Sequence, residues 1–129
     1  MIGKNADLNE FNDALQIWVN NHTHVLLLDQ ITLEVETIYR DSFNESVYCF
    51  VERTAKEKFI VSDDGRSLFK LDPSASDVDL IATIGDIAIA SEFNFNLQNG
   101  VISAKADRQN LIDTIMRLAQ LQVNISYLN

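Results

Sequence analysis

The side chains best suited to chemistry are two adjacent carboxylates, Asp63 and Asp64, which follow an apolar stretch. Carboxylates at a strand end can hold a hard cation such as Mg²⁺, as a metal-dependent nuclease or hydrolase requires. Adjacent strand residues point to opposite faces, however, and Gly65 follows directly. An Asp-Gly pair is typical of a turn, because glycine adopts a positive φ at no cost. We therefore favour a turn here and keep the cation site as the alternative.

The remaining reactive side chains form no catalytic group. His22 and His24 could contribute to a zinc or copper site, but the sequence has no second cluster of His or Cys to complete it. A solvated helix end is the favoured interpretation. Cys49, the single cysteine, lies in an apolar segment and is expected in the core. No G-x-S-x-G, G-x-G-x-x-G or P-loop pattern is present. The sequence predicts no catalytic residue, cofactor or metal, with the Asp63-Asp64 hydrolase as the alternative.

The charge of the chain is strongly negative, with 19 acidic and 10 basic residues and a net charge of −9. That sign repels phosphate backbones, so direct nucleic-acid binding is not expected. The excess of acids lies in residues 1–39 and 71–104, and the second segment has no Lys or Arg. The candidate binding surface consists of acidic side chains from these segments: Glu34, Glu36, Asp77, Asp79, Asp86 and Glu92.

Neither a membrane span nor a secretory signal is expected. The longest apolar run, Val25 to Leu28, is far shorter than the roughly 20 residues that cross a bilayer. Residues 1–7 lack the apolar stretch of a signal peptide. We therefore expect a cytoplasmic protein.

The elements that position these residues follow from hydrophobic periodicity. Apolar residues recur every three or four positions in three segments, which predicts helices. These are residues 8–21, residues 76–90, and a C-terminal segment capped by Asp107 that extends beyond residue 121. Capping boxes open the first two: Asp7 with Glu10, and Ser76 with Asp79. Trp18, Phe93 and Phe95 take inward-facing positions and are expected in the core.

Alternating or β-branched segments predict strands, joined by short connections that make antiparallel neighbours. They are residues 31–37, 46–53, 58–62 and the two arms of a hairpin around Asn99-Gly100. The order is α-β-β-β-α-β-β-α. We therefore expect a single α+β domain over residues 1–129, with an antiparallel sheet of about five strands and three helices.

One stretch carries a family resemblance. The segment from Phe59 to Leu68 (FIVSDDGRSL), followed by a helix, the Asn99-Gly100 hairpin and a C-terminal helix, resembles the domain of unknown function numbered 1828. The resemblance covers residues 30–125. It implies a family of bacteria, phages and mobile elements with no settled activity, so it transfers no catalytic residue.

Three functions remain open. The first is a non-catalytic acidic protein-binding module, encoded by a phage or prophage, that inhibits or regulates a cytoplasmic host protein. In one form it imitates nucleic-acid phosphates toward a basic nucleic-acid-binding partner. The second is the metal-dependent hydrolase on Asp63 and Asp64. The third is a structural homodimer through the edge of the Asn99-Gly100 hairpin. The lack of grouped catalytic side chains favours the first.

Overall fold

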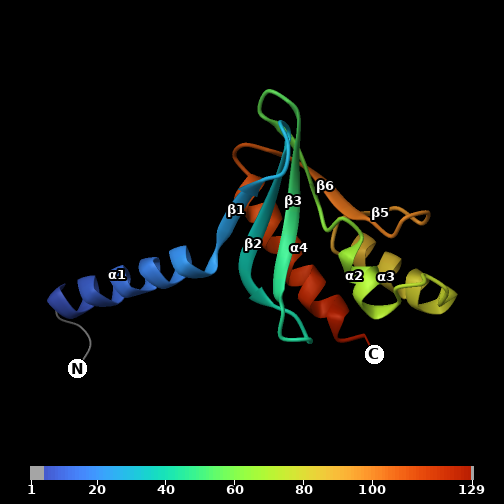
Figure 1. The fold of residues 1–129 in the computed structure, drawn as a ribbon, viewed down its shortest axis with the longest axis horizontal. Coiled ribbons are helices and arrows are strands. Elements are labelled where there is room, and N and C mark those ends of the chain that lie inside the picture. The colour runs from blue at the N-terminus through green and yellow to red at the C-terminus, as the bar shows by residue number, and fades with distance from the viewer. Residues whose placement is uncertain (1–4, 129) are drawn as a thin grey trace.

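The computed structural model describes residues 5–128 as one antiparallel sheet with four helices (Figure 1). The strands are β1 (His24–Leu27), β2 (Thr32–Arg40), β3 (Ser46–Ala55), β4 (Lys58–Ser62), β5 (Asn94–Phe95) and β6 (Ile102–Asp107). The helices are α1 (Asn5–His22), α2 (Arg66–Leu71), α3 (Val78–Ala90) and α4 (Leu111–Ser126). The strand order is β1-β2-β3-β4-β6-β5, so β1 and β5 are the two edges. This confirms the α+β class and the antiparallel pairing; β1 and α2 are additional to the predicted elements.

The core lies between α4 and one face of the sheet. Alternate residues of β3, Val47, Cys49 and Val51, are buried because they point toward α4. Ile115 and Leu118 of α4 are buried from the other side, which confirms the predicted stripe of the C-terminal helix. Each fully buried side chain of this size contributes roughly 1.5–3 kcal/mol. Among residues 5–128, no helix lies across the opposite face of the sheet, which is called the open face below (Figure 1).

The predicted helix caps are wrong in detail. Asp7 lies within α1, and α3 is capped by Asp77, whose side chain accepts a hydrogen bond from the Leu80 N–H, and not by Ser76. Asn110, not Asp107, precedes α4, and Asp107 instead accepts hydrogen bonds from the N–H groups of the two residues after Arg108. The caps of α3 and α4 lie one and three residues from the predicted ones, because neighbouring polar residues compete for the same role.

The hairpin around Asn99-Gly100 forms, but its first strand is short. β5 contains only Asn94 and Phe95, and the loop closes through a hydrogen bond from the Gly100 N–H to the Asn96 carbonyl. Phe95 packs against α3 at Gly85, where an added Cβ would lie 2.9 Å from the ring. The glycine inside α3 therefore serves this close approach.

The first helix departs from the rest of the molecule. Figure 1 shows α1 extending away from the β1 edge, with the sheet and the other helices on the opposite side of that edge. Phe93 is buried and Phe95 half-buried, as predicted for core residues. Trp18 is 47% exposed, so its predicted place in the core is wrong. Within residues 5–128, no helix combines the length and apolarity needed to cross a bilayer.

Candidate functional site

Asp63, one of the two candidate cation ligands, is part of the backbone architecture of a turn. Its Oδ1 accepts hydrogen bonds from the N–H groups of Gly65 and Ile102, both at 2.9 Å, and its Oδ2 accepts one from Ser67 at 3.1 Å. The side chain is fully buried. Burial raises the pKa of Asp63, and the three N–H donors oppose that rise. The carboxylate therefore ties β4 to β6 and to the start of α2.

Asp64, the other candidate ligand, is exposed on the outside of the same turn. Asp64 and Gly65 adopt positive φ angles of 55° and 78°, as a turn at this position requires. Over residues 5–128, no three side chains from His, Cys, Asp and Glu are grouped as a metal site would need. The structure therefore accounts for the Asp-Asp-Gly sequence through the turn.

The two histidines lie at the junction between α1 and β1. The His22 ring stacks on Trp18, with ring centroids 4.0 Å apart, and its Nδ1 lies 2.7 Å from the Trp18 carbonyl oxygen. His24 is the first residue of β1, and its Nε2 lies 3.9 Å from Glu36 Oε1. His22 therefore lies at the end of α1, and His24 at the start of β1.

The six acidic residues of the predicted binding surface divide into two groups. Glu34 and Glu36 lie on the open face of β2, beside the β1 edge. The other four lie on or just beyond α3, which packs on β5 at the opposite edge of the sheet: Asp77, Asp79, Asp86 and Glu92. The structure does not bring the six residues together into one surface.

The open face near Glu34 carries a partner for its charge. The Arg66 guanidinium lies 3.5 Å from Glu34 Oε1 and stands 5.0 Å and 5.1 Å from the ring centroids of Tyr48 and Phe50. Contacts of this kind between a guanidinium and an aromatic face are favourable. The Arg66 guanidinium therefore balances the negative charge of Glu34 in this part of the predicted acidic surface.

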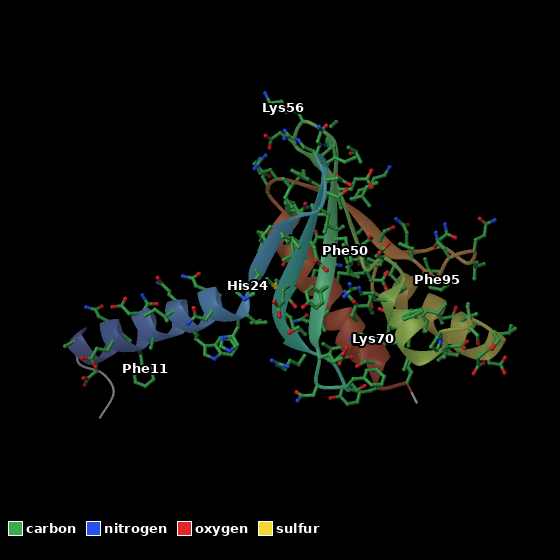
Figure 2. The ribbon with its side chains drawn as sticks, in the orientation of Figure 1. Phe11, His24, Phe50, Lys56, Lys70 and Phe95 are labelled. Atoms are coloured by element: carbon green, nitrogen blue, oxygen red, sulfur yellow. The ribbon has the colours of Figure 1, made fainter. Side chains whose placement is uncertain are left out.

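The largest uncovered apolar feature is a stripe along α1. Leu8, Phe11, Leu15 and Trp18 recur at spacings of three and four, so they share one face of the helix. All four are exposed, Phe11 by 58% and Leu15 by 61%. Figure 2 shows Phe11 projecting from α1 far from the sheet. The sequence predicts the stripe, but its periodicity does not reveal that the chain leaves the stripe uncovered.

The edge strand β1 is apolar on both faces. Val25 and Leu27 pair with Val35 and Leu33, which pack toward the core, so they face the α4 side of the sheet. Leu26 is opposite Glu34 and therefore lies on the open face. All four residues of β1 are exposed. Edge strands normally carry charges, prolines or bulges that block further pairing, and residues 25–28 have no such residue.

An apolar groove of about 290 Å³ lies at the end of β1 that is farther from α1. Leu27, Ile31 and Phe59 line it from β1, the turn after β1, and β4. Arg53 and Arg108 add positive charge to its lining. Nothing in the sequence pattern indicates this groove, because its residues come from four separate segments.

The comparisons with known proteins give one match. No curated protein and no solved structure matches the chain. The family model described as Domain of unknown function DUF1828 matches residues 37–125, from within β2 to the end of α4, so that α1 and β1 lie outside the matched region. The match covers more than half of the 129 residues and confirms the resemblance seen in the sequence. The chain therefore belongs to the DUF1828 family.

Proposed function

We propose that this chain is a non-catalytic protein-binding module that docks on a cytoplasmic protein through its N-terminal arm, residues 5–31. The arm comprises α1, β1 and the turn that follows. One observation carries the proposal. Ten of the eighteen large apolar side chains that are exposed in the described chain belong to this arm. They are Leu8, Phe11, Leu15, Ile17, Trp18, Val25, Leu26, Leu27, Leu28 and Ile31.

The arm exposes a large apolar area. At about 200 Å² for a large side chain, ten side chains that are a little over half exposed present on the order of 1,000 Å² in total, divided between α1 and the two faces of β1. The stripe of α1 alone presents on the order of 450 Å², which is the size of the largest apolar patch on a typical monomer, and such patches are often interaction sites. Covering this area is therefore the main favourable term in docking.

The charge on the arm specifies the kind of surface it would meet. Asp7, Glu10 and Asp13 lie on α1, and Asn5–His22 contains no Lys or Arg. A complementary partner surface is apolar at its centre and basic at its rim, since opposite potentials across an interface favour correct pairing. This keeps the expectation of an acidic binding protein but moves the binding element from the six listed acids to the arm.

Photo-crosslinking from the arm tests this proposal. A photoreactive residue replaces Leu15 in the full chain, and a matched variant carries it at Ile89, an apolar residue of α3 with similar exposure. We expect illumination of cells that produce the chain to give a discrete crosslinked protein from position 15 and none from position 89. A chain that forms no crosslink from position 15, or equal crosslinks from both positions, would show that the arm is not a docking element.

A further inference from the structure

We propose that the protein covering the arm is a second copy of this chain, which pairs through β1 and exchanges α1. This inference rests on the proposed function and names its partner. The sequence analysis placed a homodimer contact at the edge of the Asn99-Gly100 hairpin, but the edge strand there, β5, has only two residues. The β1 edge is longer and apolar on both faces, so it is the better candidate for pairing.

The free backbone groups of β1 allow it to pair with a copy of itself. The Leu28 N–H donates to the Thr32 carbonyl, so alternate residues of β1 direct their N–H and C=O groups toward β2. Those of Val25 and Leu27 consequently point away from the sheet. Two antiparallel β1 strands related by a two-fold axis would satisfy these groups in both chains. An isologous contact of this kind closes as a dimer and leaves no further β1 edge.

Antiparallel pairing also brings α1 of each chain to the groove of the other. His24 starts β1 and Leu27 ends it, so the two-fold axis places the start of one β1 beside the end of the other. The helix of the second copy then joins its strand near Leu27 and Ile31, where the apolar groove lies.

Charge favours the chain itself as the occupant. Five of the ten basic residues lie at the end of the sheet that contains the groove, around the β3–β4 turn that Lys56 marks in Figure 2. They are Arg53, Lys56, Lys58, Lys105 and Arg108, and the same end carries Glu52, Glu57 and Asp107. Arg108 pairs with Glu57 at 2.7 Å, whereas Arg53 lines the groove and has no ion-pair partner within the described residues. The acidic helix α1 of a second copy would supply a carboxylate near Arg53.

The area is also that of a stable dimer. A standard interface buries roughly 800 Å² on each partner. The arm presents on the order of 1,000 Å² of apolar surface on each chain, estimated as above from about 200 Å² per large side chain. Mutual burial of the two arms therefore meets the requirement without any third protein.

Sedimentation equilibrium of the full chain tests the inference. We expect a mass of twice 14.6 kDa for the wild type and for Ile89→Glu, and a single-chain mass for Leu15→Glu. Because Leu15 and Ile89 are both exposed, neither change should unfold a single chain, which far-UV circular dichroism verifies. A wild type that stays monomeric at about 100 μM, or a dimer that survives Leu15→Glu, would overturn the second copy as occupant.

Engineered cysteines locate the pairing. A two-fold axis through antiparallel β1 strands places either Val25 or Leu26 opposite its own copy, so Val25→Cys or Leu26→Cys should oxidise to a covalent dimer. Ile89→Cys should not, and native Cys49 is buried and does not interfere. A dimer without either disulfide would contradict pairing through β1. A monomeric chain that still crosslinks to a different protein through position 15 rejects the second copy and leaves the proposed function standing.

Discussion

Apolar side chains are placed in opposite ways in the two regions of this molecule. In the body, residues 32–128, strand β3 and helix α4 turn their apolar residues toward each other and bury them. In the arm, residues 5–31, helix α1 has an equally regular stripe and strand β1 an apolar run, and both remain exposed. An amphipathic pattern thus specifies a face that must be covered. It does not specify whether the same chain supplies the cover.

The largest expected effect comes from the buried carboxylate of the body. Asp63→Ala removes the acceptor of three backbone N–H groups and should lower the free energy of unfolding by about 4 kcal/mol. The matched variant Asp64→Asn keeps a residue that tolerates positive φ and should change stability by less than about 0.5 kcal/mol. Urea unfolding measures both. Equal effects at the two positions would contradict the architectural role of Asp63.

A core truncation in the body should have the next largest effect. Leu118 is fully buried between α4 and the sheet, so Leu118→Ala should lower the free energy of unfolding by about 3 kcal/mol. Because this core lies within a single chain, most of the loss in the free energy of unfolding should be the same at low and at high chain concentration. Denaturant midpoints at two widely separated concentrations provide the check. A loss below about 1 kcal/mol would mean that the site is not a packed core.

The ion pair of Asp41 and Lys70 should give a smaller, pH-dependent effect. Burial tends to raise the pKa of Asp41, but the Lys70 ammonium and the N–H groups of Glu45 and Phe43 outweigh it and hold the pKa below its ordinary value of 3.8. A carboxylate with a lowered pKa stabilises the fold above the unfolded pKa and loses this contribution as the pH falls toward the folded one. Asp41→Asn should therefore lower the free energy of unfolding by about 1–2 kcal/mol at pH 7.

The pH dependence of that variant sharpens the comparison further. The stability difference between wild type and Asp41→Asn should shrink as the pH falls below 3.8, and thermal unfolding across pH 2–7 follows it. A difference that grows in acid would contradict the lowered pKa.

The arm should show the smallest effect on a single chain, and one that depends on concentration. Leu15→Ala removes an exposed side chain, so in dilute solution it should change stability by less than about 0.5 kcal/mol. For a dimer, each tenfold increase in chain concentration adds about 1.4 kcal/mol to the free energy of unfolding per mole of dimer, or about 0.7 kcal/mol per chain. The difference in the free energy of unfolding between wild type and Leu15→Ala should therefore increase with chain concentration. A gap independent of concentration would contradict association through the arm.

The sequence predicts those parts of the fold whose pattern extends over several residues. The α1 stripe, the alternation in β2, the strand β3 and the Asn99-Gly100 turn are confirmed. The unpredicted elements lack such a pattern. β1 is a continuous apolar run without alternation, and α2 has six residues, fewer than two turns.

The candidate site was less predictable because it depends on distance in space. Sequence analysis grouped Glu34 with Asp79 by charge, but Glu34 lies on β2, near the β1 edge, and Asp79 lies on α3, which packs on β5 at the other edge. It assigned Trp18 to the core because the residue continues an apolar stripe, and a stripe carries no information about its cover. The groove beside Leu27 is lined by residues from distant segments, so a pattern within one segment cannot predict it.

The fluorescence of Trp18 gives the most direct test of the central claim that a second copy covers the arm. Trp18 is the single tryptophan of the chain, so the emission reports on α1 alone. The pH is held constant because the His22 ring stacks on the indole. We predict that concentrating the full chain shifts the emission to shorter wavelength and protects it from acrylamide quenching, and that dilution reverses both. Emission and quenching that stay those of an exposed indole at every concentration would contradict the account.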